Sequence, residues 1–303
     1  SFQAEDGIRD KRGGLVGSEM CIRDRALGFP LSDLCWNGTE EQLALTENTQ
    51  PAILTHSVAA LRVLESLGAP EPVAVAGHSL GEYSAHVAAG TLAFADAVRS
   101  VRDRGRFMQE AVPVGAGAMA AIIGLEPGNL DDIFLEAARG EVVSAANLNS
   151  PGQIVIAGHA GAVGRAVDMA REQGARKAVP LPVSAPFHCS LMEPAAASLG
   201  PVLQAVEFDT PSVPVVANVD GAAVGTGERA RQALLEQVCA PVRWIDVMET
   251  MIGDGVESFV EIGPGKVLAG LVKRIDRKIP AVACGDAAGV EKFLAGIGEG
   301  SDG

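Results

Sequence analysis

The sequence predicts an α/β protein of two domains, and three observations lead to this prediction. The chain has 303 residues, of which 48% are hydrophobic but only 4% aromatic. Such a composition fits a core of Ala, Val, Leu and Ile between helices and sheets, and the length suggests about two domains. A strand–turn–helix pattern lies over residues 72–89, and a longer alternation of strand and helix patterns follows over residues 115–183.

The first pattern is a βα unit. Pro51–Leu67 has apolar residues at helical spacing, with Pro in its first turn and Gly68 after its end. Pro72–Ala76 is a short apolar run of the kind buried in a parallel sheet. The turn Gly77–Gly81 then leads into a predicted helix over Glu82–Ala89.

The second pattern predicts a small domain over residues 115–183 with the element order βαββαβ, that of a ferredoxin-like domain. Its predicted strands are Ala118–Leu125, Val142–Leu148, Gln153–Ala157 and Arg176–Val183, and its helices are Leu130–Arg139 and Ala162–Gln173. A large α/β domain takes residues 26–114 and 184–303. Its later part is predicted to contain a helix near Leu191–Leu199, strands Val213–Val219 and Ser258–Ile262, and a final helix Lys266–Ile275.

Composition excludes several classes of function. The net charge is −14, from 38 acidic and 24 basic residues, whereas duplex binding needs a basic face. The five Cys residues are scattered without a C-x-x-C pair, which favours reduced thiols over a disulfide framework or a zinc site. No apolar run approaches the ~20 residues that cross a bilayer. We therefore expect a cytoplasmic, monomeric protein with no metal, no nucleic-acid partner and no membrane contact.

The first 25 residues differ from the rest. They contain five acids and five bases, no apolar periodicity, and Ile-Arg-Asp twice. One interpretation is a polar tail. The other, which we favour, is that residues 3–10 and 16–25 resemble translated sequencing adapters, so that residues 1–25 are non-native and natural sequence begins near Ala26.

Ser79 is the first candidate for chemistry, because it lies in a Gly-x-Ser-x-Gly turn between a predicted strand and a predicted helix. Such a turn is expected to need small residues on both sides of the Ser, and the following helix N-terminus supplies positive potential and free N–H groups. A capping Ser in a glycine turn is the alternative. The flanking strand and helix favour a nucleophile.

A nucleophilic Ser needs a base, and His188 is the best candidate because it lies in a loop at the predicted domain junction, where pockets form. His78 adjoins Ser79, so its side chain should project elsewhere. The other His residues, at predicted helices or after a strand, are His56, His86 and His159. An ordinary serine esterase has an acid after the Ser and a His near the C-terminus, yet 115 residues follow His188 (303 minus 188) and no motif marks an acid. A Ser–His pair without an acid suits acyl transfer to a thiol.

Arg104 is the third candidate. It shares an Arg-rich helical segment with Arg99, Arg102 and Arg106, and such a segment usually forms a solvated face. One buried Arg among them would bind a substrate carboxylate through two parallel hydrogen bonds, which Lys imitates poorly. The pattern alone does not select Arg104 from the four.

Several segments together resemble the malonyl-CoA:acyl carrier protein transacylases of fatty acid synthesis. They are Gly77–Ala85 (GHSLGEYSA), Arg104–Gln109 (RGRFMQ), Gly117–Gly124, Asn149–Gly158, Pro182–His188 and Val260–Lys266, and the likeness covers about residues 26–285. The resemblance implies a hydrolase-like large domain, with the ferredoxin-like domain inserted into it. It also implies that Ser79, activated by His188, takes malonyl from coenzyme A and passes it to the pantetheine thiol of acyl carrier protein. No metal or other cofactor is implied.

The resemblance also assigns roles to other residues. Arg104 matches the residue that pairs with the malonyl carboxylate, and Leu80 matches a main-chain donor of the oxyanion hole. Gln237 matches the position whose main-chain carbonyl orients the histidine in place of a triad acid. Phe187 resembles the malonyl-type motif rather than that of branched-extender enzymes.

The chain departs from the family pattern at its start. The family opens with a strand and a Gly-Gln-Gly-Ser-Gln loop that gives a second oxyanion donor, and no Gly-Gln-Gly occurs here. Three alternatives therefore stay open: a polyketide-type acyltransferase, a serine thioesterase, and a non-catalytic remnant.

An acidic carrier protein would need a local basic surface on a chain of net charge −14. The densest basic run is Lys273, Arg274, Arg277 and Lys278, and Arg176 with Lys177 is the other candidate. A solvated final helix is the plainer interpretation of the first group.

Overall fold

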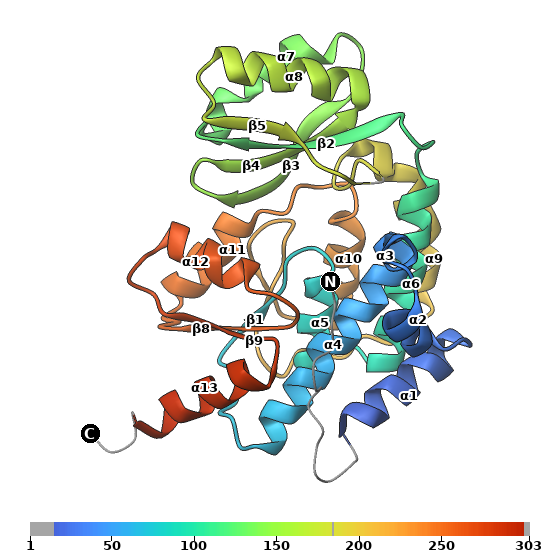
Figure 1. Ribbon diagram of the computed structural model, residues 1–303, viewed down its shortest axis with the longest axis vertical. Helices are drawn as coiled ribbons and strands as arrows, with labels where there is room; N and C mark the ends of the chain where they lie inside the picture. The colour runs from blue at the N-terminus through green and yellow to red at the C-terminus, as the bar shows by residue number, and fades with distance from the viewer. Residues whose placement is uncertain (1–14, 184, 300–303) are drawn as a thin grey trace.

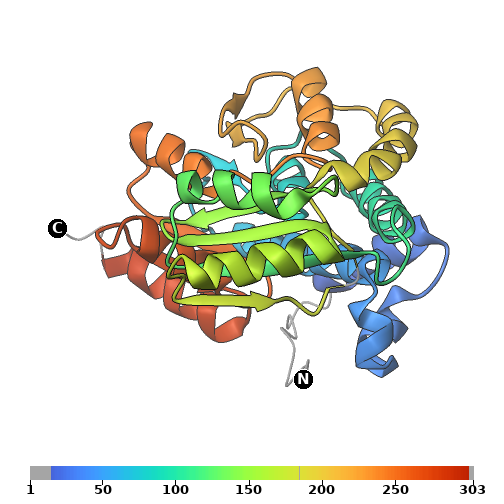
Figure 2. The same cartoon turned by 90° about the horizontal axis from the view of Figure 1, so that it is seen from above.

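Figure 1 shows the computed structural model, which describes residues 15–183 and 185–299. A small sheet with helices α7 and α8 forms the upper part of this view, and a larger α/β part lies beneath it. Seen from above, α7 and α8 lie along one face of the small sheet (Figure 2). The predicted α/β class is confirmed, and the sheets together contain both parallel and antiparallel strand pairs.

The small sheet has the strand order β3-β4-β2-β5, and each neighbouring pair is antiparallel. Its strands are β2 (Gly117–Ile123), β3 (Val143–Ser150), β4 (Gln153–His159) and β5 (Lys177–Pro180), and its helices are η1 (Pro127–Asn129), α7 (Asp131–Ala138) and α8 (Ala160–Glu172). The chain order of strands and α-helices is the predicted βαββαβ. The last strand is shorter than the predicted Arg176–Val183: it ends at Pro180, and Pro182 beyond it has no N–H to continue the ladder.

The larger part contains two separate sheets among the described residues. One has the order β1-β6-β7, with β1 (Val75–Ala76) parallel to β6 (Val215–Val216) and β6 antiparallel to β7 (Ala223–Val224). The other pairs β8 (Phe259–Ile262) with β9 (Ala281–Cys284) in parallel. The predicted strand Pro72–Ala76 is wrong in its first half, and Val213–Val219 is too long because the chain turns back after Ala217, whose N–H donates to Ala222.

Helices surround these sheets. They are α1 (Leu15–Leu27), α2 (Leu31–Asn37), α3 (Glu40–Ala44), α4 (Thr46–Ser66), α5 (Gly81–Ala88), α6 (Phe94–Glu110), η2 (Ser190–Met192), α9 (Glu193–Gln204), α10 (Gly227–Glu236), α11 (Trp244–Gly253), α12 (Val267–Ile275) and α13 (Ala287–Glu299). The prediction that Lys266–Ile275 is the final helix is wrong, because β9 and α13 follow it. α13 packs Val290, Phe293 and Leu294 against α4 residues Val63 and Leu64.

The start of the described chain also differs from the prediction. Residues 15–25 belong to α1, which contacts α4 and α6, whereas the sequence predicts no element there. The buried positions Glu19 and Arg23 lie one helical turn apart, and Ala26 and Leu27 continue that stripe into the core. Because half of the stripe is polar, hydrophobic periodicity does not reveal it. Residues 1–14 lie outside the described residues, and the non-native origin of residues 1–25 stays a prediction.

The chain passes between the larger part and the small sheet twice, before Gly117 and after Leu181. Gly117, at the entry to the small sheet, lies so close to Pro186 that a Cβ on Gly117 would come 2.4 Å from the proline ring. Leu181 donates its N–H to the Met119 carbonyl at 2.9 Å. These contacts fix the course of the segment that carries His188. Among the helices of the described ranges, none is both long enough and apolar enough to cross a membrane.

Candidate active site

The turn between β1 and α5 holds Ser79 in a left-handed conformation, with φ of 52°. A Cβ on Gly77 would lie 2.0 Å from the Gly81 main chain, so only glycine fits at residue 77. Asn218 closes the turn: its Oδ1 accepts from Ser79 N at 2.6 Å and its Nδ2 donates to Gly77 O at 2.8 Å. Two hydrogen bonds to one amide side chain therefore fix the turn that carries the strained Ser.

His188 lies 109 residues after Ser79 in the chain, and its Nε2 is 2.7 Å from Ser79 Oγ. Its Nδ1 is 2.7 Å from the main-chain oxygen of Gln237. Because a carbonyl only accepts, Nδ1 carries the proton and Nε2 is free to accept the Ser79 hydroxyl proton. Burial, and secondarily the charge of Arg104, lower the pKa of His188 to about 3, so the imidazole is neutral and ready to act as a base.

Arg104, on α6, is 2% exposed and reaches the nucleophile. Its NH2 donates to Ser79 Oγ at 3.1 Å and to Gln237 Oε1 at 2.8 Å, and its NH1 donates to Gln50 Oε1 at 2.8 Å. Its Nε has no hydrogen-bond partner among the described residues. A buried cation with neutral partners and an unused donor is suited to an incoming carboxylate.

The other arginines of α6 lie elsewhere. Arg99 and Arg106 are exposed and pair with Asp96 and Asp103 one turn away. Arg102 is half-buried, pairs with Glu47 at 3.1 Å and covers the Phe29 ring.

A cavity of about 170 Å³ opens at Ser79. It is lined by Thr46, Gln50, Ser79, Leu80, Arg104, Met108, Phe187 and His188. This volume is below the ~300 Å³ at which drug-sized ligand pockets begin, which suits a small acyl group. The structure thus brings Ser79, Leu80, Arg104 and His188 to one cavity, with Gln237 directly behind them.

Sequence reasoning missed Gln50, Asn218 and Glu82, which complete the hydrogen bonds of the site. Gln50 and Asn218 carry no sequence signal, because their partners lie far away in the chain. Glu82 lies within the segment Gly77–Ala85, but nothing in that pattern marks its contact with Gln237. The His residues not proposed as bases lie elsewhere: His78 Nε2 is 2.8 Å from Asn149 Oδ1, and His159 Nδ1 accepts from Val142 N.

A serine with a neutral imidazole on one side and a buried guanidinium on the other defines the site of an enzyme that transfers acyl groups bearing a carboxylate. The comparisons with known proteins agree with this class. The model of the acyl transferase domain family matches residues 18–288. The malonyl CoA-acyl carrier protein transacylase of Escherichia coli strain K12 is 52% identical over 269 residues, which cover 89% of this chain and 87% of that protein. The Bacillus subtilis protein of the same name is 46% identical over 280 residues, covering 92% and 88%.

Solved structures give the same result. The malonyl CoA-acyl carrier protein transacylase of Coxiella burnetii superposes with a TM-score of 0.91 at 44% identity, covering 93% of this chain and 89% of that one. A malonyl-transacylase in complex with its type II PKS acyl-carrier protein has a TM-score of 0.91 at 47% identity, covering 93% and 91%. The chain belongs to the acyl transferase domain family and, within it, to the malonyl CoA-acyl carrier protein transacylases. The resemblance drawn from its motifs is confirmed.

Proposed function

We propose that this chain transfers malonyl from malonyl-CoA to the pantetheine thiol of acyl carrier protein, through a malonyl ester on Ser79, in fatty acid biosynthesis. One observation carries the proposal: Ser79 Oγ lies between His188 Nε2, at 2.7 Å, and Arg104 NH2, at 3.1 Å. A malonyl group has its carboxylate one methylene beyond the reacting carbonyl. An ester on Oγ therefore has that carboxylate within reach of the guanidinium.

In the first half-reaction, His188 Nε2 takes the hydroxyl proton while Ser79 Oγ attacks the thioester carbonyl. The main-chain N–H of Leu80, at the start of α5, is positioned to donate to the oxyanion. Collapse of the tetrahedral intermediate breaks the C–S bond, and the proton on His188 passes to the coenzyme A thiolate. In the second half-reaction the carrier thiol gives its proton to His188 and attacks the ester carbonyl. Collapse of this intermediate breaks the C–O bond to Ser79, and the proton on His188 passes to Ser79 Oγ.

Gln237 replaces the acid of a hydrolytic triad in this mechanism. Its neutral carbonyl orients His188 and stabilises the imidazolium less than a carboxylate would. A weaker base disfavours attack by water and leaves the ester for a thiol, which gives up its proton more easily.

Peptide mass spectrometry after incubation with malonyl-CoA tests this function. We expect one malonyl group on Ser79, none in Ser79→Ala, and release of the label to carrier protein only when the carrier has its pantetheine arm. Release to water at the same rate without a carrier would identify a thioesterase instead. Absence of any acylation in a single turnover would identify a non-catalytic remnant.

We propose that the carrier protein docks on a surface that contains both basic groups of the sequence. These are Arg176 with Lys177, and Lys273 with Arg274, Arg277 and Lys278. Lys177, Ile123 and Gln153 are directly opposite one another on β5, β2 and β4, so their side chains share the sheet face away from the small-domain core. Arg274 of α12 reaches across and donates to Gln153. Strand β2 therefore lies between β5, which carries Lys177, and β4, whose Gln153 accepts from Arg274.

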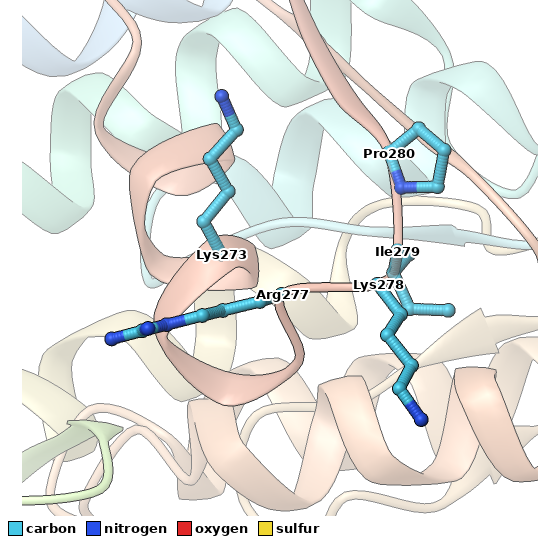
Figure 3. Close-up of a pocket in the computed structure, with 5 residues that line it drawn as sticks. All are labelled: Lys273, Arg277, Lys278, Ile279 and Pro280. Carbon is cyan, nitrogen blue, oxygen red and sulfur yellow. The ribbon is translucent and has the colours of Figure 1, made fainter.

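A hollow of about 520 Å³ lies at the C-terminal end of α12, the helix that carries Arg274, and is lined by Lys273, Arg277, Lys278, Ile279 and Pro280 (Figure 3). The three basic side chains point away from one another, so they form a broad positive surface rather than a single anion site. Such a surface suits the spread charge of an acidic protein.

The finer assignment of domains belongs to the same proposal. Residues 115–183 form a ferredoxin-like domain, which the order β3-β4-β2-β5 with two helices on one face supports. Residues 26–114 and 184–303 form a hydrolase-like domain, which the strand–Ser turn–helix unit supports. We also propose that the protein acts as a cytoplasmic monomer.

A further inference from the structure

Glu82 is a buried acid that the mechanism above does not use. It lies on α5, three residues after the nucleophile, and its side chain is fully buried. Its Oε2 accepts from Gln237 Nε2 at 2.9 Å and from Asn218 N at 3.1 Å. Its Oε1 has no hydrogen-bond partner among the described residues. A buried carboxyl with one unsatisfied oxygen is costly and calls for an explanation.

Gln237 connects Glu82 to the site. The Gln237 Nε2 donates to Glu82 Oε2 at 2.9 Å and, less closely, to the Ser79 main-chain oxygen at 3.2 Å. The Gln237 Oε1 accepts from Arg104, and the main-chain oxygen accepts from His188. A side-chain amide has two ends of nearly equal shape, so its orientation depends on its neighbours. Here two acceptors face the Nε2 end, of which Glu82 Oε2 is the nearer, and the Arg104 donor faces the Oε1 end. A flip would set NH2 against the guanidinium and two oxygens against each other.

We propose that Glu82 is a positioning residue that fixes the Gln237 amide with its oxygen toward Arg104, and so keeps Arg104 oriented for the substrate carboxylate. The inference rests on the proposed function. The amide also separates the two charges: a direct Glu82–Arg104 ion pair would occupy the donors that malonyl needs. Through a neutral amide, Glu82 holds Arg104 in position and leaves its Nε unpaired.

Either protonation state of Glu82 serves this role. Burial raises the pKa of Glu82 to about 7, against the opposing effects of Asn218, Gln237 and Arg104, and the charge of Asp220 raises it further. A proton on Oε1 leaves Oε2 as an acceptor. Gln at residue 82 should therefore substitute for Glu, whereas an apolar residue of similar size should not.

The test compares Glu82→Gln, Glu82→Met and the control His86→Leu. This control also replaces a buried polar group of α5, but its ring nitrogens have no hydrogen-bond partner among the described residues. The fraction of active enzyme is measured by the burst of Ser79 acylation, and kcat/KM is then measured for malonyl-CoA and for acetyl-CoA. We expect Glu82→Met to lower the malonyl-to-acetyl ratio about tenfold or more, the size expected for a lost hydrogen bond in a charged network. Glu82→Gln and His86→Leu should keep the ratio within about threefold.

A double variant shows whether Glu82 acts through Gln237. In a Gln237→Leu background, which keeps the main-chain carbonyl, Glu82→Met should add little to the loss of selectivity. The proposal is overturned if Glu82→Met lowers both substrates equally, if Glu82→Gln loses as much selectivity as Glu82→Met, or if the two effects multiply. If Glu82→Met does not fold, the test uses Gln237→Leu by itself. An unchanged malonyl-to-acetyl ratio of kcat/KM in Gln237→Leu then overturns the proposal. Wild-type enzyme without any burst would instead contradict the proposed function.

Discussion

Arg104 carries its charge into the protein, and none of its hydrogen-bond partners among the described residues is a carboxylate. Its hydrogen-bond partners Gln50, Gln237 and Ser79 are all neutral. Burial lowers its pKa, but a guanidinium stays charged at any pH at which the protein is folded. No anionic hydrogen-bond partner among the described residues therefore balances the positive charge of Arg104, and this favours the binding of an anion.

Replacing Arg104 by Ala should lower kcat/KM for malonyl-CoA far more than for acetyl-CoA. Removing one partner of a buried charge pair typically costs about 2–5 kcal/mol, which is roughly 30- to 5,000-fold. Arg104→Lys should recover only part of this, because an ammonium lacks the two parallel donors. Steady-state kinetics with malonyl-CoA and acetyl-CoA measure the loss of kcat/KM on each substrate for each variant. Equal losses on both substrates would make Arg104 a structural residue.

At the scale of elements, the two glycines of the turn between β1 and α5 differ in how much space a side chain would have. A Cβ on Gly77 would collide with the Gly81 main chain at 2.0 Å, whereas a Cβ on Gly81 would meet nothing within 4 Å. The expectation that both positions need a small residue is therefore wrong for Gly81. The motif spacing alone does not distinguish the two.

Gly77→Ala should abolish Ser79 acylation and lower the melting temperature, because the turn has to open to admit the methyl group. Gly81→Ala, the matched control, should keep kcat within about threefold and leave stability unchanged or slightly higher, since Ala favours the helix. Thermal unfolding and burst amplitude measure both effects. An active, stable Gly77→Ala variant would contradict the geometry of the turn.

Sequence reasoning predicted the elements that contain their own signals and missed those that depend on distant partners. The Gly-x-Ser-x-Gly turn, its strand and its helix are local, and so is the alternation of residues 117–180. Asn218 and Gln50 are different, because they meet Ser79 and Arg104 across 139 and 54 residues of chain. α1 was missed because its buried stripe contains Glu19 and Arg23. Predicted strands near prolines were too long because the apolar pattern does not register missing N–H groups.

At the scale of the whole molecule, buried histidines make stability depend on pH. Burial lowers the pKa of His86 to about 4 and that of His188 to about 3. A depressed His pKa contributes stability that is present above about 6.5 and is lost as the pH falls through the folded value. Glu82 has the opposite sign: its raised pKa contributes stability present below its ordinary value of 4.5 and lost as the pH rises through about 7.

His86→Leu should therefore reduce the loss of unfolding free energy between pH 7 and pH 4 by about 3 kcal/mol, the equivalent of its pKa shift. Its side-chain nitrogens have no partner among the described residues, so Leu sacrifices no hydrogen bond. Thr91→Val is the control, because it removes a buried hydroxyl without a titratable group. Urea unfolding at the two pH values measures the difference. A parallel loss in wild type and His86→Leu would show that His86 does not stay neutral in the folded state.

The charge of the whole molecule opposes an acidic carrier protein, so docking depends on where the few bases lie. The net charge of −14 repels at long range, while two lysines of the proposed carrier surface are exposed: Lys177 on β5, and Lys273 on α12, the helix whose Arg274 contacts Gln153. At a Debye length of about 8 Å, the distant acids are screened and the nearest bases dominate. Lys177→Glu and Lys273→Glu should each raise the KM for carrier protein several-fold, more at low salt than at high salt. Arg274 is a poorer choice, since its side chain also joins the two parts of the fold.

The matched control is Lys292→Glu on α13, which changes the net charge equally but lies at the end of the molecule away from the small sheet (Figure 1). It should leave the carrier KM unchanged, which separates local contact from net charge. All three variants should keep the wild-type rate of Ser79 acylation by malonyl-CoA, because the cavity at Ser79 contains none of these lysines. If the carrier KM rises as much in Lys292→Glu as in Lys273→Glu, net repulsion governs docking. If neither Lys177→Glu nor Lys273→Glu changes it, the carrier binds another face.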